Sequence, residues 1–362
     1  MANGREGSGV SRRAWLKWTA GLAGFLGGAA AWTRVGVPRL PLGSAVQAGA
    51  GMAGAHGASV VGAVDTSFFD PMAFLTEFDW GRVSRLPDGR TLREYDLVAT
   101  DREIEVAPGV RFPAWTYNGR VPGPTLRCRE GDRLRVHFTN AGTHPHTIHF
   151  HGIHPPEMDG VFPLVPPGGA FTYEFDARPF GLHLYHCHAM PLKRHIHKGL
   201  YGVFLVDPPR PRPPARELVM VMNGFDTNFD GENEVYAVNT VAFYYQAHPI
   251  PVTVGELVRV YLVNMTEFDP INSFHLHAAM FRLYRTGTDL ERYEWTDTVM
   301  MCQGERHVLE FTLEHPGLHM FHAHQSEFAE LGWMGFFDAR PAVAADAGGA
   351  GGARRVDPEG AA

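Results

Sequence analysis

The chain has 362 residues, enough for two domains of ordinary size, and its formal net charge is -7. This mildly acidic balance argues against nucleic-acid binding and supplies no basic patch for a membrane surface. Three cysteines do not make a disulfide framework. We expect Cys128 and Cys302 to be free buried thiols, although export would permit a bridge between them. Twenty histidines are many for this length, and most fall in four short clusters.

The first 50 residues are predicted to be a targeting segment. Residues 11–17, SRRAWLK, resemble a twin-arginine export signal with Trp15 where Phe is common. The Gly/Ala-rich stretch 19–32 is too short for a confident membrane span, although a basic tail followed by an anchor helix is the alternative. We therefore expect a periplasmic or secreted protein, with residues 51–90 as an N-terminal extension.

From residue 91 the pattern predicts an all-β chain. Apolar and polar residues alternate between Gly, Pro and Asn at 92–100, 102–109, 111–119, 124–140 and 146–154. Short strands at this spacing indicate a β-sandwich or Greek-key barrel. The predicted boundaries are a first domain at 91–207, a Pro-rich linker at 208–216, a second domain at 217–341 and a disordered tail at 342–362.

The two predicted domains repeat each other. HTIHFHG (146–152) precedes GLHLYHCH (181–188) in the first, and NSFHLHA (272–278) precedes GLHMFHAH (317–324) in the second. GDRLRVHFTN (131–140) likewise matches GELVRVYLVN (255–264). Two tandem cupredoxin-like Greek-key sandwiches are the simplest account of this repeat.

Each domain carries two His-x-His pairs, and in a strand both members of a pair point to one face because side chains alternate. The pairs are His149/His151, His186/His188, His275/His277 and His322/His324. A polar strand face could explain one pair, but four pairs in register favour a metal cluster. A tetrahedral zinc site does not need eight imidazoles, whereas a multinuclear copper cluster does.

A second donor set is predicted on the other face of the first domain. In a strand, Cys187 points away from His186 and His188, so a thiolate site and an imidazole pair lie a few bonds apart. This suits electron transfer between two metals, and the alternative is a buried cysteine flanked by surface histidines. With His146 and His195, Cys187 forms the trigonal donor set of a blue copper site.

The axial position of that site falls to Leu200, which cannot bind copper. Met190 and His197 are nearby alternatives, for which a structural role is favoured. The second domain has lost the set, because its matching positions are Asn272, Ala323, Phe328 and Trp333.

These motifs resemble those of the multicopper oxidases, specifically the two-domain bacterial type with type 1 copper in the first domain, over about residues 91–340. The resemblance implies four coppers per chain equivalent. It also implies that type 1 copper takes up electrons, that Cys187 passes them on through His186 and His188, and that O2 is reduced to water. It implies a homotrimer whose clusters join ligands from two subunits. Type 2 copper would be held by His149 and His275, and the type 3 pair by His151, His186, His188, His277, His322 and His324. Asp159 matches an outer-shell acid of related oxidases, although it also suits a turn before Gly160; Glu327 and Glu330 are weaker candidates.

Two other functions remain open from the sequence. A copper nitrite reductase shares the two-domain trimer and the blue site, but its mononuclear catalytic copper would not need His188 or the complete pair His322/His324. A periplasmic copper-binding or electron-transfer protein would need no cluster. The electron donor is also open: a phenol, a metal ion or a small redox protein.

Overall fold

The computed structural model describes residues 63–342. The predicted export signal and most of the C-terminal tail lie outside the described residues. Within the described part, no helix is long and apolar enough to cross a membrane.

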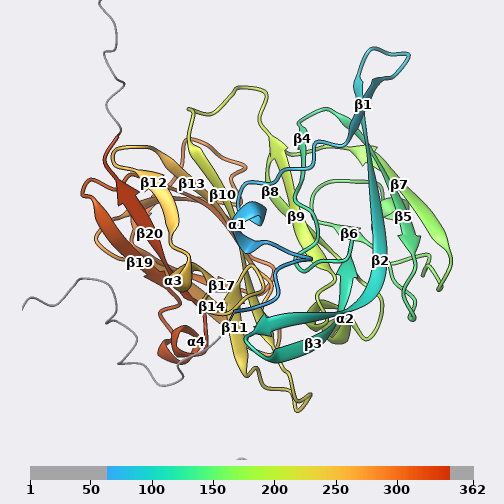
Figure 1. The fold of residues 1–362 in the computed structure, drawn as a ribbon. Coiled ribbons are helices and arrows are strands. Elements are labelled where there is room, and N and C mark those ends of the chain that lie inside the picture. The colour runs from blue at the N-terminus through green and yellow to red at the C-terminus, as the bar shows by residue number, and fades with distance from the viewer. Residues whose placement is uncertain (1–62, 343–362) are drawn as a thin grey trace, which may run out of the picture. The chain divides into compact units, whose positions relative to one another are not determined.

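The first domain is a sandwich of two sheets, drawn in blue to green in Figure 1. One sheet has the order β1-β2-β5-β7, with β3 also paired to β2, and the other has the order β4-β9-β8-β6. Their alternating residues supply a shared core that includes Leu97, Phe138, Phe150 and Phe204. The strands are β1 (Arg82–Arg85), β2 (Thr91–Ala107), β3 (Val110–Tyr117), β4 (Leu126–Arg129), β5 (Arg133–Asn140), β6 (His149–Phe150), β7 (Ala170–Asp176), β8 (Gly181–His186) and β9 (Tyr201–Asp207).

The second domain repeats this plan in the yellow to red part of Figure 1. Its sheets have the orders β11-β10-β13-β18-β15-β16 and β12-β20-β19-β14-β17. The strands are β10 (Arg216–Phe225), β11 (Val235–Val238), β12 (Ile250–Thr253), β13 (Val258–Asn264), β14 (Ile271–Leu276), β15 (Phe281–Arg285), β16 (Glu294–Thr296), β17 (Thr298–Cys302), β18 (Arg306–Phe311), β19 (Gly317–His322) and β20 (Met334–Arg340). Parallel pairs recur as β2–β5 and β10–β13, and as β4–β9 and β12–β20. The predicted all-β tandem sandwich is therefore confirmed.

Strand β8 is buried along its whole length, on both faces. Tyr185 joins the core of the first domain, whereas Leu182 and Leu184 share a buried cluster with Val219 and Val221 of β10. The backbone N–H of Leu182 also donates to the carbonyl of Thr286, at 2.7 Å. The strand that ends at the His-Cys-His triplet is thus held by both domains.

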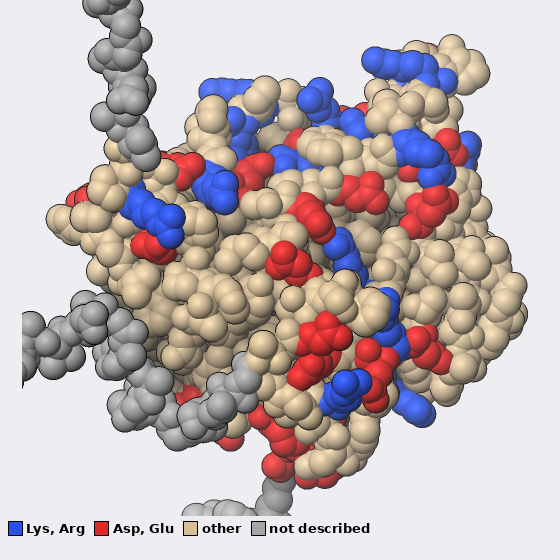
Figure 2. Space-filling model, in the orientation of Figure 1, with Lys and Arg blue, Asp and Glu red and all other residues tan. Residues whose placement is uncertain are grey.

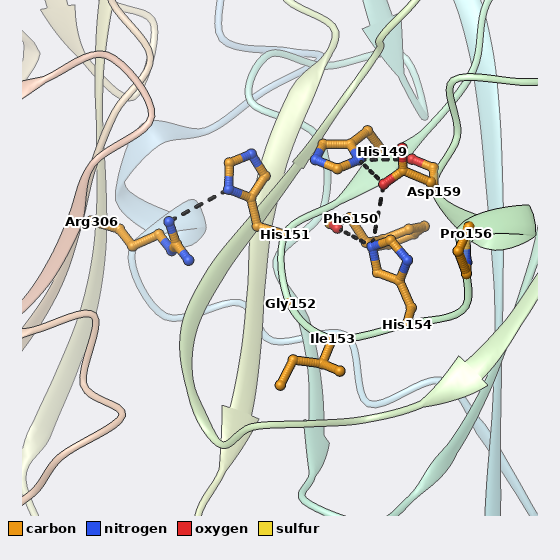
Figure 3. A pocket seen from close by; sticks show the side chains of 9 residues that line it. All are labelled: His149, Phe150, His151, Gly152, Ile153, His154, Pro156, Asp159 and Arg306. Carbon is orange, nitrogen blue, oxygen red and sulfur yellow. Dashed lines mark hydrogen bonds and ion pairs between the residues drawn. The ribbon is translucent and has the colours of Figure 1, made fainter.

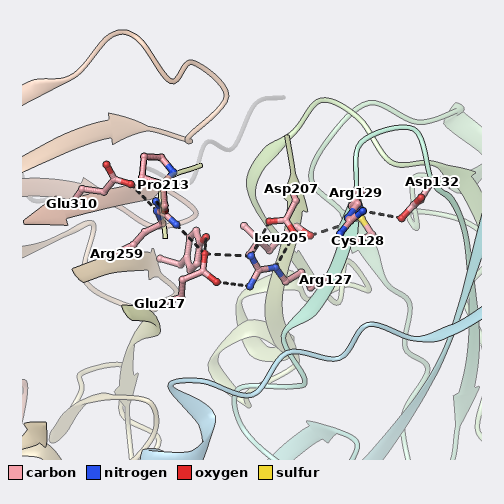
Figure 4. Close-up of polar contacts among 11 residues, drawn as sticks. Arg127, Cys128, Arg129, Asp132, Leu205, Asp207, Pro213, Glu217, Arg259 and Glu310 are labelled. Atoms are coloured by element: carbon pink, nitrogen blue, oxygen red, sulfur yellow. Dashed lines mark hydrogen bonds and ion pairs between the residues drawn. The ribbon is translucent and has the colours of Figure 1, made fainter. Parts of the chain in front are cut away.

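An ion-pair network also crosses between the domains (Figure 4). Arg127 of β4 makes two hydrogen bonds to Asp207, at 2.9 and 3.0 Å, and two to Glu217 of β10, at 2.7 and 3.2 Å. Arg259 continues the network to Glu217 and Glu310. Elsewhere, acidic and basic side chains lie beside one another over the face shown in Figure 2.

Three local predictions need correction. The segments 92–100 and 102–109 form one strand, β2, with a register shift between Glu105 and Ala107, because no Gly or Pro interrupts the chain between them. The predicted strand 146–154 is reduced to β6, since His146 makes only an isolated bridge with Val165. Cys128 and Cys302 are free, as expected, but Cys302 is exposed because it ends β17 at the open edge of its sheet.

Candidate metal centre

Each His-x-His pair lies where a strand ends, which corrects the prediction that both members lie within the strand. The first members belong to β6, β8, β14 and β19, and the second members follow just beyond the strand ends. The ladder nevertheless continues for one more bond, because the N–H of His151 donates to Leu184 and that of His277 donates to Met320, both at 2.9 Å. The backbone therefore stays extended at His151 and His277, whose rings contact those of His149 and His275.

The predicted blue site is assembled from three buried side chains. The Sγ of Cys187 lies 3.2 Å from Nδ1 of His195 and 3.9 Å from Nδ1 of His146, and the two nitrogens are 3.2 Å apart. His195 comes from the short helix α2 (Leu192–His197), and His146 from the loop before β6. Three donor atoms therefore converge on one point from three separate segments.

The electrostatics of this set favour a metal ion. Burial lowers the pKa of His146 and His195 to about 4, so both imidazoles are neutral ligands at ordinary pH. Burial also raises the pKa of the Cys187 thiol, so a bound cation is needed to hold it as a thiolate. The N–H of Thr147 donates to this sulfur at 3.4 Å. The residues present therefore fit a copper ion of the blue type.

Leu200 is fully buried beside this set. Its carbonyl accepts from the N–H of Cys187 at 2.9 Å, and its N–H donates to the carbonyl of His195 at 3.2 Å. Met190 is 77% exposed, which separates it from the buried donors. His197 is buried, but its Nε2 accepts from the N–H of Asp226 at 3.1 Å, and its ring packs against Phe268.

The matching positions of the second domain are filled rather than open. Asn272, Ala323 and Trp333 are completely buried, and Phe328 nearly so. Trp333 makes edge contacts with aromatic rings of the core, and the Nδ2 of Asn272 donates to Thr266. The loss of ligands at this position thus coincides with close packing.

The first domain brings its paired histidines into one set. His149 and His186 are directly opposite in the β6–β8 ladder, and Nε2 of His186 lies 3.2 Å from Nε2 of His151. The Nδ1 of His149 donates to the carbonyl of Asp159 at 2.7 Å, and the Nδ1 of His186 donates to that of Cys187 at 2.9 Å. These bonds fix the tautomer and leave Nε2 free to bind a metal.

His188 completes this first-domain set, with its ring centroid 5.5 Å from that of His149 and 6.0 Å from that of His186. Mainly because of burial, the pKa of His151 falls to about 2 and that of His186 to about 4, so both imidazoles are neutral ligands at ordinary pH. The set opens into a cavity of about 600 Å³, part of which is seen in Figure 3.

The second domain builds a matching set. His275 and His322 are directly opposite in the β14–β19 ladder, and Nε2 of His322 lies 2.9 Å from that of His277. The Nδ1 of His275 donates to the carbonyl of Asp297 at 3.0 Å, and the ring of His324 lies 5.4 Å from that of His275. Among residues 63–342, no hydrogen bond or ring contact joins this set to the first-domain set. One chain therefore carries two half-sites.

Several residues near these sets were not predicted. Asp297 repeats the position of the predicted Asp159, whose carboxylate lies 3.2 Å from His149. Arg306 of β18 reaches from the second domain into the first-domain cavity, donates to the carbonyl of Leu182 at 2.9 Å and lies 3.5 Å from Nδ1 of His151 (Figure 3). Packing of β18 against β8 of the other domain brings Arg306 there, so spacing along the chain gives no signal for it. Glu327 and Glu330 lie on α4 (Ser326–Glu330), and neither bonds to a histidine of the described sets.

Two sandwiches with one His-Cys-His set and paired histidines in both domains define a two-domain copper protein of the cupredoxin type. Profiles described as "Multicopper oxidase" match residues 99–211 and 211–343. The chain therefore belongs to the multicopper oxidase family.

Individual relatives include proteins of both expected reaction types. A solved multicopper oxidase is 56% identical, with a TM-score of 0.75, over 77% of this chain and 100% of the other. The blue copper oxidase of Nitrosomonas europaea is 29% identical, with a TM-score of 0.61, over 68% of this chain and 86% of the other. The copper-containing nitrite reductase of Neisseria meningitidis is 29% identical over 242 residues, which are 61% of this chain and 62% of that relative. The chain thus spans about three-fifths of the length of this curated relative.

Proposed function

We propose that this protein is a copper-dependent oxidase that couples four one-electron oxidations of a donor to the reduction of O2 to two waters. The observation that carries the proposal is the repetition of a complete four-histidine set in both domains, although only one domain keeps the blue site. Eight imidazoles can hold a cluster of three coppers, whereas one mononuclear site uses about half of them or fewer.

The proposed type 1 site and the proposed copper cluster use separate residues. His146, Cys187 and His195 would hold type 1 copper beside the buried side chain of Leu200, and the paired histidines would hold the type 2 and type 3 coppers. Bound copper supplies one-electron exchange at the first site and multielectron reduction of O2 at the cluster. His186 is the last residue of β8, the strand held by both domains, and is covalently joined to Cys187. Asp159 and Asp297 orient His149 and His275 through their carbonyls.

The half-sites also support a proposed homotrimer, in which the first-domain set of one subunit meets the second-domain set of another. The outward face of the second-domain sheet carries His275 and His322 together with the exposed apolar residues Ile271, Met300 and Leu318. An exposed apolar face beside unfinished ligand sets is expected of a subunit interface. Light scattering of the copper-loaded protein should give a trimer, and a stable active monomer would contradict this assembly.

Reduction of nitrite is the second candidate, because a copper-containing nitrite reductase is among the relatives. The two functions differ in the histidines that they need. Neither His188 nor His322 would be required by a mononuclear nitrite site, and neither belongs to the blue site.

The experiment compares wild-type protein with His188→Ala and His322→Ala, all loaded with copper. O2 uptake with a phenolic donor and anaerobic reduction of nitrite are measured separately. Each variant should lose O2 uptake and keep the blue absorption, whereas the control His248→Ala, an exposed histidine stacked on Tyr244, should keep both. Efficient nitrite reduction that survives in both variants, without O2 uptake by the wild type, would establish the second candidate instead.

The place of action is proposed from the sequence alone. Export by the twin-arginine route, followed by function in the periplasm or outside the cell, rests on residues 11–17. Replacement of Arg12 and Arg13 by lysine should keep the protein in the cytoplasm of an expressing bacterium, which fractionation would detect.

A further inference from the structure

A cavity of about 670 Å³ lies beside α2, the helix that carries His195. The second domain supplies its other side, through residues 226–231 and Phe268. The lining includes Pro191, Lys193, Arg194, Lys198, Phe229 and Phe268. Its volume falls within the range of sites that hold small molecules.

The charged lining of the cavity is mainly cationic. Lys193, Arg194 and Lys198 line it, and Lys193 and Lys198 are the only lysines after Lys17 in a chain that otherwise uses arginine. The carboxylates on the other side are already engaged: Asp226 accepts from the N–H groups of Asp230 and Gly231, and Asp230 accepts from that of Glu232. The lining thus carries three cations against two carboxylates, and an anion entering the cavity would meet a small net positive charge.

The cavity also has two aromatic walls that the fold holds in an unusual conformation. Phe229 and Phe268 have φ values of 65° and 72°, which bulky side chains rarely adopt. Phe229 is 53% exposed, so burial does not account for its position. The Nζ of Lys193 lies 4.1 Å from the ring centroid of Phe268, and that of Lys198 lies 4.4 Å from that of Phe229. Strained backbone at a cleft is a recurrent mark of a ligand site.

Contacts connect this cavity to the blue site. The guanidinium of Arg194 lies 5.2 Å from the ring of Trp115. That indole is in turn 4.8 Å from the ring of His195 and 5.2 Å from that of His146. Along this path, a molecule in the cavity would be separated from both imidazole ligands by the side chains of Arg194 and Trp115.

We infer that this cavity binds a small aromatic carboxylate, and that its oxidisable members are phenolic acids that serve as electron donors. The ring would stack beside Phe229 and Phe268, and the carboxylate would face Lys193 and Arg194. The donor part of the inference rests on the proposed function. Each phenolic acid would lose one electron and its hydroxyl proton to give a phenoxyl radical that keeps its carboxylate charge. The electron passes to the blue site and the proton to solvent, and four such electrons with four protons from solvent reduce one O2 to two waters.

Binding is tested without turnover, by calorimetry on the copper-loaded protein. The probe is 3,4,5-trimethoxycinnamate, which has no phenolic hydroxyl, and its uncharged amide is the matched comparison. The carboxylate should bind about fivefold more tightly than the amide at low salt, and 0.5 M salt should reduce this preference. Lys193→Gln should remove most of the preference, whereas Arg85→Gln, which removes an exposed cation on β1, should keep it.

The outcomes separate the site from the oxidase function. Equal binding of carboxylate and amide by the wild type, or an unchanged preference in Lys193→Gln, would overturn the inference. In steady-state O2 uptake, Lys193→Gln should raise KM for sinapate about fivefold and leave KM for sinapyl alcohol within twofold. Selective binding of the carboxylate without O2 uptake from either donor would keep the binding site and refute the proposed function instead.

Discussion

Replacement of Gly160 by alanine should loosen the outer support of His149. Gly160 follows Asp159 with φ +80°, and a Cβ there would lie 1.9 Å from the carbonyl oxygen of Ile148 and 2.8 Å from the backbone N of His149. Both neighbours are backbone atoms, so the loop that carries Asp159 must move. That movement would break the 2.7 Å bond from His149 to the carbonyl of Asp159.

The matched control is Gly168→Ala, because Gly168 has φ +79° and nothing within 4 Å of its would-be Cβ. Left-handed strain of about 1–2 kcal/mol should be common to both variants. Only Gly160→Ala adds the clash, and loss of an outer-shell partner lowers metal affinity by about 10–100-fold. Chelator competition followed by copper analysis measures this difference. Equal copper affinity in the two variants would refute the assigned role of the Asp159 loop.

Four further predictions concern other parts of the molecule. Cys187→Ser should abolish the intense blue absorption and leave copper in the histidine cluster, as measured by visible and EPR spectra; a variant that stays blue would place the site elsewhere. Arg127→Met should lower the free energy of unfolding by about 3 kcal/mol in urea titrations, because it leaves the mostly buried Asp207 without its ion-pair partner and removes one of the two arginines paired with Glu217; a loss below about 1 kcal/mol would class the network with surface ion pairs. Burial alone would raise the pKa of Glu217, but hydrogen bonds from Arg127 and Tyr261 hold that pKa below its usual 4.5. Ionised Glu217 therefore contributes to the free energy of unfolding above pH 4.5, and this contribution should be lost in acid titrations of the wild type as the pH falls through the lowered pKa. Leu200→Met should lower the potential of the blue site in redox titrations by supplying an axial thioether, and an unchanged potential would show that residue 200 does not face the metal.

Most of the fold could be predicted from the sequence, because the same motifs occur in both halves of the chain and each half supports the interpretation of the other. The paired motifs of one domain recur in the other, and the ladders that oppose His149 to His186 and His275 to His322 follow from that repeat. Strand ends were harder to predict: β2 runs through two predicted strands, and the pairs lie across the ends of their strands, because continued hydrogen bonding rather than composition decides these limits.

Features made by contact between domains could not be predicted. Arg306 lies two residues before the buried Val308 of β18, yet its side chain lies beside His151 of the first domain. Likewise, Lys193 and Phe229 are far apart in sequence and have no shared motif, but they line the same cavity. Such placements depend on how two sandwiches pack, which local patterns do not encode.

The central claim is that the two histidine sets make a trinuclear copper site for O2, and electron counting tests it most directly. Copper-loaded wild-type protein is given a phenolic one-electron donor, and O2 uptake, donor oxidation and peroxide are recorded together. One O2 should be consumed for every four electrons, with no accumulation of peroxide. One O2 for every two electrons with peroxide, or no O2 uptake from a protein that reduces nitrite under anaerobic conditions, would contradict the claim.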